Sequence, residues 1–109
     1  MDARRHPRYK HEVAIRVYPR NASVVRGHTV DLSENGASAM LLVEIPVGEM
    51  VRLEFDLLDA PVEVHAIVRQ RNAFRYGMQF MDSAAVHAAI AHACNRLAME
   101  QSLREPKIP

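Results

Sequence analysis

Hydrophobic and polar residues alternate along most of the chain between Val13 and Met81, which is the pattern of strands that bury one face. The clearest example is residues 51–57, where every second residue is apolar. Turn-forming residues separate further segments with the same period: 13–18, 24–33, 62–69 and 76–80. A sixth segment lies between turn signals at 34–36 and 46–48. We predict a mainly β fold, a six-stranded antiparallel β-barrel, because closure removes most exposed strand edges.

After residue 82 the apolar period lengthens to that of a helix. The residues at this spacing are Val86, Ile90, Cys94 and Leu97. Asp82 or Ser83 can cap the helix, and the many alanines favour it. We therefore divide the chain into an extended N-terminal basic arm and one domain of barrel and C-terminal α-helix, followed by a frayed tail. The ranges are 1–12 for the arm, 13–82 for the barrel, 83–103 for the helix and 104–109 for the tail.

The composition is that of one ordinary globular domain. Of 109 residues, 49% are hydrophobic and 25% are charged, and the formal net charge of +1 excludes a generally basic nucleic-acid coat. The positive charge is local. The first ten residues hold four basic side chains and one acidic one: Arg4, Arg5, Arg8, Lys10 and Asp2. A chain of this length does not hold a catalytic domain beside a regulatory one, so we expect its output to pass through a partner.

Several functions are disfavoured because their sequence signals are missing. The six histidines show no metal-ligand spacing, no nucleophile and base stand at a motif spacing, and no phosphate-binding loop occurs. We expect neither an enzyme nor a metal or cofactor site. No apolar run approaches the roughly 18 residues that span a bilayer, and the N-terminus lacks the apolar region of a signal peptide. With Cys94 as the single cysteine, we expect a cytoplasmic protein that does not span a membrane.

The segment DLSENG places polar side chains beside a turn. In a strand over residues 24–33, alternation separates two pairs of side chains: Asp31 and Ser33 on the outer surface, Val30 and Leu32 toward the interior. Gly36 follows in the turn, where a missing side chain lets backbone and ligand approach closely. Asn35 and Gly36 also form a strong turn dipeptide. Taken alone, the segment is therefore best explained as a plain hairpin, which is compatible with a ligand site.

The arginines of the arm and the carboxylate of Asp31 complement the edges of guanine. A carboxylate can accept from the adjacent N1 and N2 donors of guanine, whereas adenine offers no such pair. An arginine fork matches the O6 and N7 acceptors, a pairing worth roughly 1–3 kcal/mol. Arginine also stacks on a base face. Pro7 keeps the arm extended, so that it can lie across the barrel. The alternative for the arm alone is a solvated tail.

In these two motifs the chain resembles the PilZ domain family, which binds the bacterial second messenger cyclic di-GMP. The family pattern is RxxxR followed by [D/N]xSxxG, and the matching residues are Arg4, Arg8, Asp31, Ser33 and Gly36. RYGMQF, residues 75–80, also resembles a recurrent PilZ segment. The resemblance covers nearly the whole chain and implies a six-stranded antiparallel barrel with a C-terminal helix. We expect a stand-alone adaptor without a fused domain.

The resemblance also implies roles for individual residues. Arg4 and Arg8 would bind guanine edges and phosphates with help from Arg5. Asp31 would recognise guanine, and Ser33 would hydrogen-bond a phosphate or a base. In this family the ligand often binds as an intercalated dimer with stacked guanines.

Three further positions complete the predicted site. Gly36 would allow close approach of the ligand. Arg69 and Arg71 either line the site from a neighbouring strand or belong to a solvated strand face.

We therefore expect a cyclic di-GMP receptor in which the ligand docks a mobile arm across the barrel and changes the surface shown to an effector protein. One alternative is a PilZ scaffold that binds proteins without any nucleotide. Another is nonspecific nucleic-acid binding, which lacks an aromatic stacking platform, so we expect neither DNA nor RNA as a partner.

Overall fold

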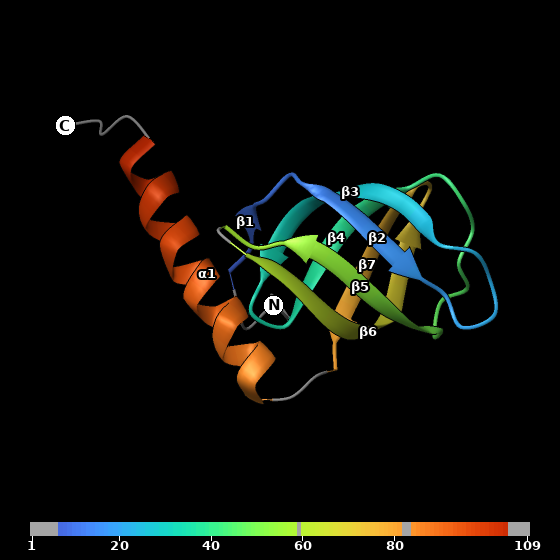
Figure 1. Ribbon diagram of the computed structural model, residues 1–109. Helices are drawn as coiled ribbons and strands as arrows, with labels where there is room; N and C mark the ends of the chain where they lie inside the picture. Colours follow the sequence, from blue (N-terminus) through green and yellow to red (C-terminus); the bar gives the residue numbers. More distant parts are fainter. Residues whose placement is uncertain (1–6, 59, 82–83, 105–109) are drawn as a thin grey trace, which may run out of the picture.

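The computed structural model describes residues 7–58, 60–81 and 84–104 (Figure 1). It contains seven strands and one helix: β1 (Tyr9–Lys10), β2 (Ala14–Tyr18), β3 (Val25–Ser33), β4 (Gly36–Leu41), β5 (Met50–Asp56), β6 (Pro61–Asn72), β7 (Arg75–Phe80) and α1 (Ala84–Arg104). Arg4 and Arg5 lie outside the described residues, as do the predicted caps Asp82 and Ser83.

Strands β2 to β7 form a closed antiparallel barrel, which confirms the predicted architecture. The strand order is β3-β2-β5-β6-β7-β4, and β4 pairs again with β3 to close the ring. The alternating apolar residues line the interior, where Leu32, Leu53 and Val64 are completely buried. Because each strand has a neighbour on both sides, the backbone groups of the sheet are satisfied within the barrel.

The helix α1 closes one end of the barrel beside β1 and extends beyond it (Figure 1). Its buried residues are Ile90, Ala93, Cys94 and Leu97. Three of these four are at the predicted helical spacing, and the fourth predicted position, Val86, is only partly buried. This confirms the C-terminal helix. Among the described residues, no helix is both long enough and apolar enough to cross a membrane.

Part of the predicted arm is a strand. Tyr9 and Lys10 pair with Leu32 and Asp31 on β3, so β1 lies along β3 as an end-to-end continuation of β2. The side chain of Thr29 bridges the break between β1 and β2. Its Oγ1 accepts from the Val13 N–H at 3.0 Å and donates to the carbonyl oxygen of His11. These bonds fix the backbone immediately after the RxxxR motif.

Two bulges interrupt the regular pairing. On β3, Thr29 pairs with Ala39 of β4 and Asp31 pairs with Ser38, which leaves Val30 as an extra residue. On β6, the pairing with β7 steps from Val68 to Gln70 in the same way. A bulge puts two residues opposite one and bends its strand.

The β3 bulge corrects the predicted alternation. Thr29 and Leu32 are both fully buried, whereas Val30 is only half-buried, because the extra residue shifts the phase of the strand. Ser33 is buried rather than on the outer surface. The turn is also displaced by one residue. It consists of Glu34 and Asn35, and Gly36 already belongs to β4, where it pairs with Ser33.

Candidate functional site

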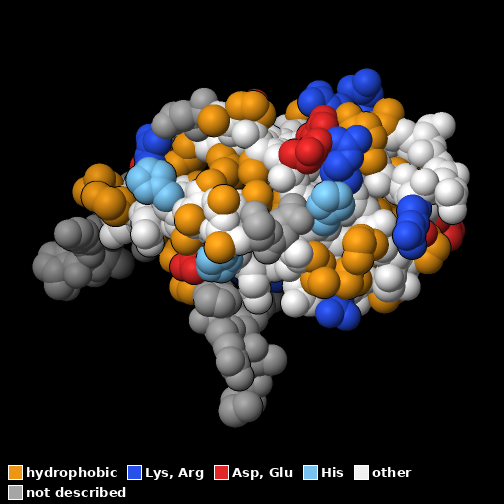
Figure 2. Space-filling view, turned by 60° about the horizontal axis from the view of Figure 1, so that its bottom comes forward, with side chains coloured by type: hydrophobic (Ala, Val, Ile, Leu, Met, Phe, Trp, Pro, Cys, Tyr) orange, Lys and Arg blue, Asp and Glu red, His pale blue; other side chains and the backbone are white. Residues whose placement is uncertain are grey.

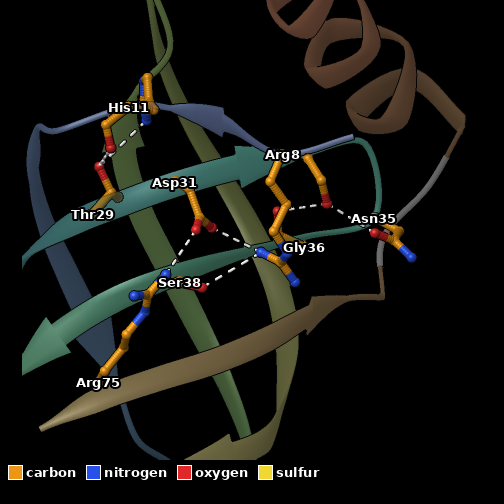
Figure 3. Close-up of polar contacts among 9 residues, drawn as sticks. Arg8, His11, Thr29, Asp31, Asn35, Gly36, Ser38 and Arg75 are labelled. Carbon is orange, nitrogen blue, oxygen red and sulfur yellow. Dashed lines mark hydrogen bonds and ion pairs between the residues drawn. The ribbon is translucent and has the colours of Figure 1, made fainter. Parts of the chain in front are cut away.

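Asp31 joins two arginines that are far apart in the sequence. Its Oδ1 accepts from Arg8 Nη1 at 2.8 Å, and its Oδ2 accepts from Arg75 Nη2 at 2.9 Å (Figure 3). The Asp31 side chain is only 14% exposed, so its pair with the largely covered Arg8 is partly shielded from solvent, whereas Arg75 is half-exposed. Hydrogen bonds between charged groups in such a setting are stronger and better oriented than surface pairs.

The sheet register brings these three side chains together. Lys10 pairs with Asp31, which places Arg8 just before β1 and beside the carboxylate. Asp31 pairs with Ser38 on β4, and Ser38 pairs with Gly77 on β7, two residues after Arg75. Arg8 Nη1 also contacts Ser38 Oγ at 3.4 Å. The two halves of the predicted motif pair are therefore adjacent in space, as we expected for Arg8 and Asp31.

A cleft of about 300 Å³ lies next to this cluster. Its lining consists of the three arginines Arg8, Arg71 and Arg75 together with Ser38, Gln70, Asn72 and Gly77. The first arginine comes from the arm and the other two from the β6–β7 hairpin. Guanidinium groups and side-chain amides are donors suited to phosphate oxygens and to guanine O6 and N7, and the Asp31 carboxylate supplies an acceptor beside them.

Of the two further arginines predicted for the site, only Arg71 lines the cleft. Its Nε donates to the carbonyl oxygen of Ala73 at 2.9 Å, and its guanidinium lies 5.6 Å from the centre of the Tyr76 ring. Arg69 is the extra residue of the β6 bulge, and its Nε instead donates to Gln79 Oε1 at 2.7 Å.

Ser33 and Gly36 hold the hairpin that carries Asp31. Ser33 Oγ lies 2.9 Å from Asn35 Oδ1 and 3.3 Å from the carbonyl oxygen of Gly36. A Cβ at Gly36 would lie 2.3 Å from the carbonyl oxygen of Met78, so β4 and β7 approach too closely there for a side chain. These contacts give both residues a structural role, and neither lines the cleft. Their direct contacts with a ligand stay predictions.

Burial shifts the pKa of two titratable groups near the core, His11 and Cys94. Burial lowers the pKa of His11, partly offset by a hydrogen bond with the Asp56 backbone and by the Asp56 charge. Burial raises the pKa of the Cys94 thiol to about 11, which leaves little nucleophilic thiolate at neutral pH. Among the described residues, no group of three His, Cys, Asp or Glu side chains is placed to hold a metal ion.

A larger hollow of about 540 Å³ lies elsewhere, against β2 and β5, and the Glu54 carboxylate in its lining is already paired. Glu54 pairs with Arg16 at 3.0 Å and with Arg52 at 2.7 Å. A hydrogen bond from the Tyr18 hydroxyl, together with these arginines, lowers the pKa of Glu54. On the face shown in Figure 2, Lys and Arg side chains occur in separate groups, not as one continuous basic surface. We therefore assign the candidate site to the smaller cleft.

The fold and the cleft agree with a family assignment. The family model for the PilZ domain matches residues 2–95, so the chain belongs to the PilZ domain family. The matched range includes both motifs, the whole barrel and the first half of α1. A search of curated proteins finds no match.

Solved structures share the fold at low sequence identity. The PilZ domain of YcgR from Escherichia coli, solved with cyclic di-GMP, is 17% identical with a TM-score of 0.73, and the match covers 95% of this chain and 100% of that one. YcgR in complex with cyclic di-GMP is 18% identical with a TM-score of 0.81, over 95% and 50% of the two chains. The inhibitor of motility MotI from Bacillus subtilis is 19% identical with a TM-score of 0.77, over 96% and 55%. This chain thus spans about half the length of the last two.

Sequence reasoning missed five residues that line the cleft: Ser38, Gln70, Asn72, Arg75 and Gly77. Arg75 opens the RYGMQF segment, but its proximity to Asp31 depends on β7 pairing with β4, which the strand pattern does not reveal. Gln70 enters the cleft just after the β6 bulge. The one available signal was the position of Arg75, a basic residue at the start of a strand directly after a short turn.

Proposed function

We propose that this protein is a stand-alone, non-enzymatic PilZ receptor that binds cyclic di-GMP in the cleft formed by Arg8, β4 and the β6–β7 hairpin. The observation that carries the proposal is the position of Asp31 between Arg8 and Arg75 at the edge of the cleft. This arrangement offers a guanine acceptor and two guanidinium forks within one small volume. The cytoplasm of a bacterium is the compartment where this ligand occurs.

Each part of the ligand has a matching group. The Asp31 carboxylate already accepts two hydrogen bonds, but a carboxylate has about four lone-pair sites, so it can also accept from guanine N1 and N2. Arg8, Arg71 and Arg75 provide forks for guanine O6 and N7 and for phosphate oxygens. Arg4 and Arg5 would add further contacts from the arm, on a ligand that can include two stacked molecules. No separate cofactor is needed.

The signal would be a change at the N-terminal arm. Arg8 directly precedes β1, so a ligand that engages Arg8 also restrains the residues before it. The arm would then lie across the ligand and present a new surface to an effector protein. YcgR binds cyclic di-GMP in the solved structures, and its fold matches this chain, which supports the same ligand class here.

Calorimetric titration with cyclic di-GMP tests this function. We expect micromolar or tighter binding to the wild type and a loss of about tenfold or more in Arg8→Ala and in Asp31→Ala, because a good pair of this kind is worth about 1–3 kcal/mol. Arg26→Ala is the matched control, since Arg26 is an exposed arginine outside the cleft. Absence of heat with folded wild-type protein would contradict the proposal and favour the nucleotide-independent scaffold.

A further inference from the structure

The connection between β4 and β5, residues 42–49, lies at the end of the barrel opposite α1 (Figure 1). It exposes apolar side chains. We call it the β4–β5 loop. Leu42 is 78% exposed, Val47 58% and Val43 48%. A hollow of about 330 Å³ separates the loop from the neighbouring β2–β3 connection. A loop with this much exposed apolar surface keeps one conformation only if specific bonds hold its backbone.

One buried side chain supplies those bonds. The Tyr76 hydroxyl donates to the carbonyl oxygen of Val43 at 2.9 Å and accepts from the Ile45 N–H at 3.1 Å. Tyr76 is completely buried on β7, in the stretch of strand that borders the cleft. The phenol therefore fixes the middle of the β4–β5 loop to the wall of the ligand site.

Arg71 adds a second link between the cleft and the loop. It lines the cleft, its guanidinium lies over the Tyr76 ring, and its Nη1 lies 3.4 Å from Glu44 Oε2 in the loop. The Glu44 side chain is 80% exposed, so this ion pair is weak. A phosphate or guanine edge inside the cleft would offer Arg71 a better shielded acceptor, with two parallel bonds in place of one.

We propose that ligand binding in the cleft moves Arg71 away from Glu44 and so loosens the β4–β5 loop, which makes the loop a second output of the receptor besides the arm. This inference rests on the proposed function. It assigns Glu44 the role of a competitor that holds Arg71 in the empty state. Since coupling between two sites is reciprocal, whatever weakens the Arg71–Glu44 pair must also favour the ligand.

Calorimetry with cyclic di-GMP measures this competition. We expect Glu44→Gln to bind the ligand about 1.5- to 5-fold more tightly than the wild type, the range that corresponds to an exposed ion pair. In an Arg71→Ala background, Glu44→Gln should make no further difference, because the competition has been removed. Glu49→Gln is the matched control. It removes the same charge from the same loop, but the loop carboxylate that pairs with Arg71 is that of Glu44.

Hydrogen exchange at the Ile45 amide, followed by NMR, gives a readout of the loop itself. We expect exchange to be faster in ligand-free Glu44→Gln than in wild type, and faster in wild type once cyclic di-GMP is added. The coupling would be overturned if the wild type and Glu44→Gln bound the ligand with equal affinity and exchange at Ile45 did not change. That result would leave the proposed function intact. Absence of any binding would overturn both.

Discussion

Gln101 of α1 forms hydrogen bonds with both backbone groups of Lys10 in β1. Its Oε1 accepts from the Lys10 N–H at 3.4 Å, and its Nε2 donates to the Lys10 carbonyl oxygen at 2.8 Å. The amide thus occupies the free edge of β1 as a neighbouring strand would. It ties the helix to the strand that follows Arg8.

Replacing Gln101 should loosen this connection. We expect Gln101→Ala to lower the free energy of unfolding by about 1 kcal/mol, the usual net worth of such hydrogen bonds. Amide exchange at Lys10 should rise more than exchange in the barrel. Urea unfolding and NMR exchange measure the two effects. Ser102→Ala, an exposed neighbour on the same helix, is the control, and an equal effect of both substitutions would contradict the assignment.

Thr29 should be needed for its hydroxyl more than for its shape. In Thr29→Val the Val13 N–H and the His11 carbonyl oxygen both lose a buried partner. We expect a loss of about 1–3 kcal/mol in the free energy of unfolding, the cost of leaving buried polar groups unsatisfied. Thr29→Ser keeps the hydroxyl and should retain most of the stability. Urea titration of both variants decides between the two roles, because a purely steric role predicts the opposite order.

Gly36 should tolerate no side chain. A Cβ there meets the Met78 carbonyl oxygen at 2.3 Å, so Gly36→Ala must push β4 and β7 apart. We expect a loss of about 2–3 kcal/mol, as for other overpacked sites. Gly48→Ala is an informative comparison, because a Cβ at Gly48 meets nothing within 4 Å and only the backbone φ of 97° is unfavourable. That cost should be about 1 kcal/mol, the order of the penalty that a Cβ brings to a left-handed backbone conformation. Thermal unfolding compares the stability losses of Gly36→Ala and Gly48→Ala. A smaller loss at Gly36 would contradict the close approach of β4 and β7.

His11 should make stability depend on pH. Burial depresses its pKa in the folded state below the ordinary value of 6.5, so the unfolded chain takes up a proton first as the pH falls. Stability is therefore complete above pH 6.5 and decreases as the pH falls toward the folded pKa. His11→Gln should show a shallower decrease over the same range. Urea unfolding at several pH values measures this, and identical slopes would argue against a buried neutral imidazole.

The fold was largely predictable because the sequence patterns that define its strands and helix are local. Period-two alternation and turn residues mark the six strands of the barrel but not β1, and the helical spacing of Ile90 and Cys94 marks α1. The bulge at Val30 was not predictable, because an extra residue is defined only by the partner strand that skips it. The same holds for the displaced turn before Gly36. Alternation along one segment carries no information about its neighbour.

The residues of the candidate site likewise divide into those that a local motif predicts and those that depend on strand pairing. Arg8 and Asp31 belong to short motifs, and the structure joins them. Arg75 and Gln70 reach the cleft only through the order and register of β4, β6 and β7, which no local pattern encodes. Ser33 illustrates the reverse case. Its motif position was evident, whereas its burial follows from the hairpin geometry around it.

The two bulges flank the β4–β7 strand pair at the same height in the barrel, one on β3 and one on β6. The β3 bulge faces Ser38 and Ala39, the β6 bulge faces Gly77 and Met78, and Ser38 pairs with Gly77 between them. One inserted residue on each flank therefore shapes the wall that carries Asp31 and Arg71. The proposed recognition site depends on strand alignment, so it should survive changes in loop length but not the loss of a single residue from β3 or β6.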